Sequence, residues 1–196
     1  MLVPHIVKPR ADTGLTNGKL GIWLFLASEV MLFGALFATY LMLRVGASDW
    51  PLGTTYLDPK WAALNTIVLI TSSVTMVMAW AMAAKRNFNK FRMFMLITVG
   101  LGFVFMCIKY IEYTAKFDHH YYPSTHVFLA IYFTLTGLHG LHVLGGMAVN
   151  AYFALFGRKA YDADPEWFTN RIENSGLFWH FVDLVWIFLF PILYLL

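Results

Sequence analysis

Five long runs of apolar residues constrain the fold of this 196-residue chain more than any other feature. The runs cover residues 20–43, 61–84, 93–113, 127–156 and 175–196. About 20 helical residues cross the roughly 30 Å hydrocarbon core of a bilayer, whereas a barrel strand needs only about 10 alternating residues. We therefore expect an all-α integral membrane protein, with five transmembrane helices in one bundle and a single domain over residues 1–196.

Composition supports a membrane protein. Hydrophobic residues make up 59% of the chain and charged residues 13%, against about 25% charged in an ordinary soluble domain. The net charge of +3 does not indicate nucleic-acid binding, because the basic residues lie mainly between the apolar runs. Residues 1–10 contain no continuous apolar core, so no cleavable signal peptide is expected.

Lys and Arg are unevenly distributed between the two sides of the predicted bundle. Ten lie in the amino-terminal arm and in the loops after the second and fourth runs: Lys8, Arg10, Lys19, Lys85, Arg86, Lys90, Arg92, Arg158, Lys159 and Arg171. Three are predicted on the opposite side: Arg44, Lys60 and Lys116. Positive residues favour the cytoplasmic side. The amino terminus is therefore expected in the cytoplasm and the carboxyl terminus outside.

Seven acidic, basic or histidine side chains fall inside the apolar runs. A charge in hydrocarbon costs roughly 3 kcal/mol or more, which makes each of them a candidate functional residue. With a rise of about 1.5 Å per residue, five are expected in a layer in the cytoplasmic half: Glu29, His139, His142, His180 and Asp183. The other two, Lys109 and Glu112, are expected near the outer edge.

The outer pair has a simple structural interpretation. Lys109 and Glu112 are three residues apart, so they can neutralise one another on one helix face and extend toward the interface. Four tryptophans, Trp23, Trp61, Trp167 and Trp179, are expected to anchor helices at the interfaces.

Glu29 has no cation near it in the sequence, so it is either protonated by desolvation or paired with a histidine of another helix. We predict that it contacts His139 or His142, and that His180 or Asp183 caps a polar connection between the fourth and fifth helices. Four glycines of the fourth run would permit the close helix approach that these contacts require: Gly137, Gly140, Gly145 and Gly146.

The residues alone leave three functional classes open. His139 and His142 can hydrogen-bond to a neighbouring helix, or they can ligate a b-type haem if each finds a partner such as His180. The chain could therefore be a proton- or ion-handling membrane subunit, a membrane b-type cytochrome or a small ion transporter.

Four motifs resemble those of subunit III of the haem-copper terminal oxidases. Residues 179–186, WHFVDLVW, are similar to the family's WHFVDxVW signature, and residues 137–143, GLHGLHV, to its GxHGLHV segment. Residues 28–33, SEVMLF, resemble its SEVxFF segment, and Glu112 with Tyr113 resembles its QxxEY motif. The motifs occur in the family's order across nearly the whole chain, which is similar to the short, five-helix form.

The resemblance implies a subunit without redox chemistry. Haem and copper would belong to partner subunits I and II, with no metal, cofactor or catalytic centre in this chain. The chain would pack directly against subunit I, bind phospholipid between its helices, and support proton uptake and sustained turnover of a proton-pumping respiratory oxidase. A prokaryotic inner (plasma) membrane is the implied location, and cytochrome c or quinol would interact only with partner subunits.

Two positions depart from the family pattern. Lys109 stands where the family usually has glutamine. Residues 168–171 replace a usual histidine pair before Glu173, so Arg171 and Glu173 become the candidates for contact with a lipid headgroup. Residues 28–30 favour a cytochrome c oxidase, whereas residues 36–40 and 177–180 resemble a quinol oxidase at least as much. We expect cytochrome c to be the electron donor, with a quinol oxidase as the alternative.

Overall fold

The computed structural model describes residues 14–51 and 53–195, and every regular element in these residues is a helix. The elements are α1 (Asn17–Gly46), α2 (Gly53–Tyr56), α3 (Pro59–Ala84), α4 (Phe88–Asp118), α5 (Val127–Phe156), α6 (Arg158–Ala163), α7 (Pro165–Phe190) and the π-helix η1 (Pro191–Leu195). Five of them, α1, α3, α4, α5 and α7, are long and apolar enough to cross a membrane. The predicted all-helical class with five transmembrane helices is confirmed. Residues 1–13, on which the signal-peptide expectation, Lys8 and Arg10 fall, lie outside the described residues.

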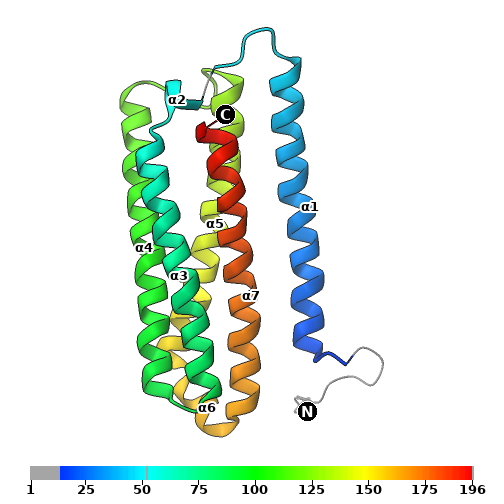
Figure 1. Ribbon diagram of the computed structural model, residues 1–196, viewed down its shortest axis with the longest axis vertical. Coiled ribbons are helices and arrows are strands. Elements are labelled where there is room, and N and C mark those ends of the chain that lie inside the picture. Colours follow the sequence, from blue (N-terminus) through cyan, green and yellow to red (C-terminus); the bar gives the residue numbers. More distant parts are fainter. Residues whose placement is uncertain (1–13, 52, 196) are drawn as a thin grey trace.

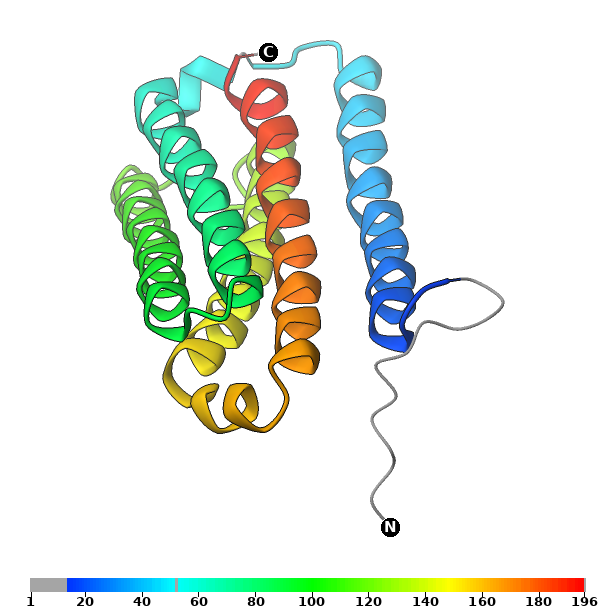
Figure 2. The same cartoon turned by 60° about the horizontal axis from the view of Figure 1, so that its bottom comes forward.

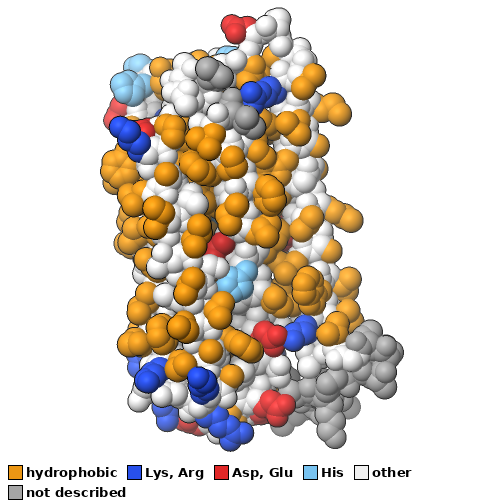
Figure 3. Space-filling view, viewed as in Figure 1, with side chains coloured by type: hydrophobic (Ala, Val, Ile, Leu, Met, Phe, Trp, Pro, Cys, Tyr) orange, Lys and Arg blue, Asp and Glu red, His pale blue; other side chains and the backbone are white. Residues whose placement is uncertain are grey.

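Four of the long helices, α3, α4, α5 and α7, form a bundle, and α1 lies at one side of it (Figures 1 and 2). The main contacts of α1 with the bundle are made to α7 and α5. We call the end with the start of α1, the α3–α4 turn and α6 the lower end, and the end with α2 and η1 the upper end (Figure 1). Figure 3 shows hydrophobic side chains over the middle of one face, with Lys and Arg gathered mainly at its lower end.

Polar side chains fix the start of each long helix. Each accepts a hydrogen bond from a backbone N–H of the first turn: Thr16, Asp58, Asn87, His126 and Asp164. Pro59 and Pro165 follow two of these caps at the first helical position, where a missing N–H has no cost. Because Asp164 and Pro165 start α7 ten residues before the apolar run at residue 175, Arg171 and Glu173 lie on a helix and not in a loop.

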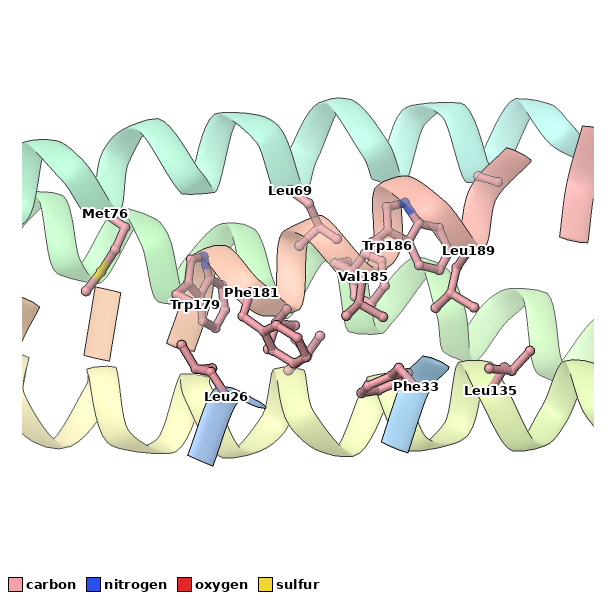
Figure 4. Packing of buried hydrophobic residues seen from close by; sticks show 14 of the residues in the cluster. Leu26, Phe33, Leu69, Met76, Leu135, Trp179, Phe181, Val185, Trp186 and Leu189 are labelled. Atoms are coloured by element: carbon pink, nitrogen blue, oxygen red, sulfur yellow. The ribbon is translucent and has the colours of Figure 1, made fainter. Parts of the chain in front are cut away.

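The apolar core is organised around α7, whose side chains meet those of α3 on one side and those of α1 and α5 on the other (Figure 4). Trp179 and Trp186 are fully buried. The expectation that Trp179 is an interface anchor was therefore wrong. Its indole Nε1 donates to Ser72 Oγ of α3 at 3.1 Å, so both the ring and its polar atom are satisfied within the protein.

Glycine makes the space for the Trp179 ring. A Cβ atom at Gly146 of α5 would lie 2.8 Å from the ring, and one at Gly102 of α4 would lie 3.0 Å from it. The other three glycines predicted to permit close packing do not do so. An added Cβ would meet no atom within 4 Å at Gly137 or Gly145, and only Met106, at 3.8 Å, at Gly140. Of the four, only Gly146 has the predicted role.

The upper end is closed by α2 and η1, which are packed backbone to backbone at Gly53. A Cβ atom at Gly53 would overlap the carbonyl oxygen of Leu193.

We expect Gly53→Ala to lower the stability of the subunit by about 1–3 kcal/mol through overpacking, measured as the thermal unfolding midpoint of the purified complex. Gly100→Ala is the matched control, because a Cβ there meets nothing within 4 Å. Equal midpoints for the two variants would contradict this packing.

Candidate functional site

Glu29 of α1 and His142 of α5 form a polar contact between the outlying helix and the bundle. Glu29 Oε2 lies 2.8 Å from His142 Nε2, and the two side chains are only 14% and 15% exposed. The predicted contact of Glu29 with a histidine of the fourth span is confirmed, and His142 is the partner.

The hydrogen bonds of His142 indicate where the protons of the Glu29–His142 pair lie. His142 Nδ1 lies 2.8 Å from the carbonyl oxygen of Leu138. A carbonyl only accepts, so Nδ1 carries a hydrogen. One further proton then lies between Nε2 and Oε2, either as a protonated Glu29 beside a neutral imidazole or as a carboxylate beside an imidazolium. The pair is therefore a site that holds one exchangeable proton.

Aromatic rings enclose the Glu29–His142 pair. The Phe33 ring of α1 meets the imidazole edge to face, with centroids 5.2 Å apart, and the Phe178 ring of α7 stacks on it at 6.2 Å. Phe33 is itself buried and packs against Phe181. These rings limit access of water to the pair, and a low local dielectric strengthens the interaction between its members.

His139 lies in a different environment, although it is only three residues from His142. Its ring packs against Phe105 of α4 and Trp186 of α7, with centroid distances of 5.6 and 5.4 Å. It is buried, and neither ring nitrogen has a hydrogen-bond partner within the described residues. The predicted hydrogen bond from His139 to a neighbouring helix is therefore not made by any described side chain.

His180 and Asp183 face α3. His180 Nδ1 lies 2.5 Å from Ser73 Oγ. Asp183 is buried near the same hydroxyl, without a hydrogen bond of standard geometry to any described residue. The prediction that these residues cap a connection between the fourth and fifth spans was wrong. The α5–α7 connection is instead made by Ser175 Oγ, which donates to Asn150 Oδ1 at 2.7 Å.

The predicted cytoplasmic-half layer thus divides into three separate sites: the pair of Glu29 and His142 between α1 and α5, His139 in the core, and His180 with Asp183 between α7 and α3. No group of three or more His, Cys, Asp or Glu side chains suited to a metal ion occurs within residues 14–51 and 53–195. Of these sites, the Glu29–His142 pair is the one in which a carboxyl group and an imidazole are hydrogen-bonded to each other.

An ionic cluster occupies the interior at the upper end. Lys109 Nζ lies 2.8 Å from Glu112 Oε2, which confirms the predicted pair. Both residues are 7% exposed, so the expected extension to the interface was wrong. Lys116 was expected in a loop, but it belongs to α4, is buried, and contacts Glu112 Oε1 at 3.2 Å. This contact could have been predicted from the sequence, because residues four apart are neighbours on a helix and Lys116 follows Glu112 by four residues.

Two tyrosines complete this upper ionic cluster, which we define as Lys109, Glu112, Lys116, Tyr132 and Tyr194. The hydroxyls of Tyr194 and Tyr132 donate to Glu112 Oε1 at 2.7 and 2.9 Å. Lys109 Nζ also donates to the Tyr194 hydroxyl at 2.5 Å and lies 4.6 Å from the centroid of the Trp186 ring. The cluster contains two ammonium groups and one carboxylate.

The predicted headgroup residues lie at the lower end. Glu173 of α7 forms an ion pair with Lys19 of α1 at 2.6 Å, which gives this carboxylate a protein partner. Arg171 is exposed, and its guanidinium lies 4.3 Å from the centroid of the Trp167 ring. These contacts tie α1 to α7 at the lower end and hold Arg171 against an aromatic ring.

Comparison of the sequence with known proteins links the chain to one family. The family profile described as cytochrome c oxidase subunit III matches residues 9–196. The chain is 35% identical to cytochrome c oxidase subunit 3 of Alkalihalophilus pseudofirmus over 195 residues, which cover 95% of this chain and 90% of that protein. It is 30% identical to cytochrome bo(3) ubiquinol oxidase subunit 3 of Buchnera aphidicola, over 94% of this chain and 96% of the relative. A probable quinol oxidase subunit 3 of Staphylococcus epidermidis is 33% identical to it, over 98% of this chain and 94% of that protein.

Proposed function

Because this chain belongs to the cytochrome c oxidase subunit III family of haem-copper oxidases, we propose that it supports proton uptake in a cytochrome c oxidase without taking part in electron transfer. The chain is a multi-pass membrane subunit of an oxidoreductase complex. In this proposal haem and copper lie in partner subunits I and II, and the chain packs directly against subunit I. Bound phospholipid contributes to stability during turnover.

The observation that carries the proposal is the Glu29–His142 pair, which holds one exchangeable proton between α1 and α5. Glu29 is twelve residues from the start of α1 and seventeen from its end, so it lies nearer the lower end. A carboxyl group and an imidazole joined by a hydrogen bond can pass a proton from one to the other. A proton-uptake role requires the lower end to face the cytoplasm.

The distribution of basic residues supports this orientation. Eight described Lys and Arg residues belong to the lower end: Lys19, Lys85, Arg86, Lys90, Arg92, Arg158, Lys159 and Arg171. Arg44 and Lys60 belong to the upper end, and Lys116 is buried in the cluster. By the preference of positive residues for the cytoplasm, the amino terminus is cytoplasmic and the carboxyl terminus outside, in a bacterial inner membrane.

Glu29→Gln tests the functional role of the pair. Glutamine preserves the size and polarity of the side chain, but it neither takes up nor releases a proton. We expect the haem content of the complex to be unchanged and its active lifetime during repeated turnover to fall severalfold, measured as oxygen consumption of the purified complex in vesicles. Glu166→Gln, at an exposed position in the first turn of α7, is the control and should behave like the wild type. An unchanged lifetime in Glu29→Gln would refute the role of the pair.

The electron donor is tested on the native complex. We expect it to contain haem and copper and to oxidise reduced cytochrome c, in keeping with residues 28–30. Oxidation of quinol alone would assign the chain to the quinol oxidases, whose subunit 3 is also similar to it. A haem retained by this chain alone would favour the membrane b-type cytochrome. Substrate flux in liposomes containing only this chain would favour the small ion transporter.

A further inference from the structure

Three polar side chains meet in the middle of the contact between α3 and α7, which lie side by side in the bundle (Figures 1 and 2). They are Ser73 of α3 and His180 and Asp183 of α7, and we call them the α3–α7 triad. Ser73, the one nearest to an end of its membrane-spanning helix, lies eleven residues before Ala84. The proposed function assigns no role to the triad.

Asp183 has the burial of a core residue although it carries a carboxyl group. It is 4% exposed, and no Lys, Arg or His of the described residues forms an ion pair with it. Neither carboxyl oxygen has a hydrogen-bond partner of standard geometry within residues 14–51 and 53–195. An ionised carboxylate in such surroundings loses its hydration without compensation, whereas a neutral carboxylic acid loses far less. The surroundings of Asp183 therefore favour a side chain that carries a proton.

Ser73 differs from the other hydroxyl residues of α3. Four of these donate to a backbone carbonyl oxygen of their own helix: Thr66, Thr71, Ser72 and Thr75. Ser73 Oγ instead lies 2.5 Å from His180 Nδ1 of α7. Ser73 is also the one polar side chain of the described residues that interacts with the Asp183 carboxyl group. Its hydroxyl therefore lies between an acid and an imidazole.

The position of this hydroxyl allows it to join the other two groups. A hydroxyl can accept one hydrogen bond while it donates another, so Ser73 can accept from the Asp183 acid and donate to His180 Nδ1. A neutral His180 then carries its own hydrogen on Nε2. His180 is half-buried, and its Nε2 is not hydrogen-bonded to any described residue. Because Asp183 is buried and His180 is partly exposed, the triad connects the interior of the subunit with its surface.

We propose that the α3–α7 triad is a proton relay, in which Asp183 holds a proton that passes through Ser73 to His180. The O–H bond of Asp183 breaks as its proton binds Ser73 Oγ, and the former hydroxyl proton of Ser73 binds His180 Nδ1. The products are a carboxylate and an imidazolium, with the serine hydroxyl restored between them. The imidazolium releases a proton from Nε2 at the surface, and the reverse sequence reloads Asp183. No electron is transferred and no co-reactant is required.

Infrared difference spectroscopy of the purified oxidase complex tests whether Asp183 carries a proton. A protonated carboxyl group has a carbonyl stretching band that a carboxylate lacks, and this band shifts in heavy water. We expect the wild type to show such a band that is lost in Asp183→Asn and moved by isotope-labelled aspartate. Asp162→Asn is the matched control, because Asp162 is exposed and paired with Arg158, and it should remove no such band. An Asp183→Asn complex that loses no band of this kind would overturn the inference.

Hydrogen exchange of the same band tests the relay itself. After transfer to heavy water, the relay carries deuterium to Asp183 although the carboxyl group is buried. We expect Ser73→Ala to slow this exchange about tenfold, because exchange then requires a local opening of the helices. Ser73→Thr keeps a hydroxyl and should restore the wild-type rate. Thr71→Ala is the matched control, since the exposed Thr71 hydroxyl donates to its own helix, and it should exchange like the wild type.

The Ser73 variants retain the acid, so they test the relay even if Asp183→Asn does not assemble. An unchanged exchange rate in Ser73→Ala would refute it. The inference rests on the proposed function only in giving this subunit a proton-handling role, and the triad shares no residue with the Glu29–His142 pair. Glu29→Gln should therefore change neither the band nor its exchange rate, which keeps the two tests distinguishable. Slower exchange in Glu29→Gln would assign the proton path to that pair and overturn the separate relay.

Discussion

Replacing Glu112 by glutamine is expected to destabilise the subunit by about 3–5 kcal/mol, the usual cost of removing one partner from a buried ion pair. Glu112 is the carboxylate that both Lys109 and Lys116 contact. It also accepts hydrogen bonds from the hydroxyls of Tyr132 and Tyr194. Without it, two ammonium groups remain in the interior with no negative charge between them. The measurement is the thermal unfolding midpoint of the purified complex, together with retention of this subunit during detergent washing.

Lys109→Gln is the matched variant, and we expect a much smaller loss of stability. The contact between Lys116 and Glu112 remains, and the two tyrosine hydroxyls still satisfy the carboxylate. One cation and one anion are then left, so the cluster has no excess charge. Glutamine is also the first residue of the QxxEY motif that residues 109–113 resemble. If Lys109→Gln abolished assembly while Glu112→Gln had no effect, the role assigned to the carboxylate would be wrong.

Trp179→Ala is expected to cost about 3–5 kcal/mol, the range for truncation of a large buried aromatic side chain. The ring fills the space left by Gly102 and Gly146, and its Nε1 donates to Ser72. Truncation therefore leaves a cavity where α3, α4, α5 and α7 meet and removes a buried hydrogen bond. The thermal unfolding midpoint of the complex measures the effect.

Trp23→Ala is the control for that experiment. Trp23 is 53% exposed on α1, so its replacement leaves no internal cavity. We expect a change within about 0.5 kcal/mol, as for surface substitutions that lack a special role. A loss at Trp23 as large as that at Trp179 would contradict the different burial of the two rings.

The number and type of the long helices could be predicted from the sequence because the length of an apolar run directly indicates a membrane-spanning helix. The face that each helix turns toward its neighbours could not be predicted in the same way. On α1, the buried Leu26 and the 76% exposed Met31 are both apolar. Lipid and protein interior are equally apolar surroundings, so hydrophobic periodicity does not separate the two faces. This is why Trp179 was assigned to an interface and His180 to the wrong neighbouring helix.

Two pairs of polar side chains could be predicted from the sequence, but the neighbours of the other buried polar residues could not. The contact between Glu29 and His142 followed from the cost of an isolated carboxyl group in lipid, which requires a partner at a similar depth. The spacing of Lys109 and Glu112 indicated their pair. The contributions of Tyr132 and Tyr194 depend on how α5 and η1 are rotated against α4, and no local pattern in the sequence specifies that rotation. The early start of α7 was available from Asp164 and Pro165, since Asp followed by Pro is a typical helix start.

The contacts of α1 bear on how a functional test at Glu29 is interpreted. Polar contacts join α1 to the rest of the chain at three heights: Lys19 with Glu173, Glu29 with His142, and the Tyr40 hydroxyl with the carbonyl oxygen of Ile192. Two points separated along a helix are enough to fix its tilt. Loss of the central contact therefore leaves α1 attached above and below, with its direction unchanged. A substitution at Glu29 therefore removes a side chain that can bind a proton, while the position of α1 in the subunit stays the same.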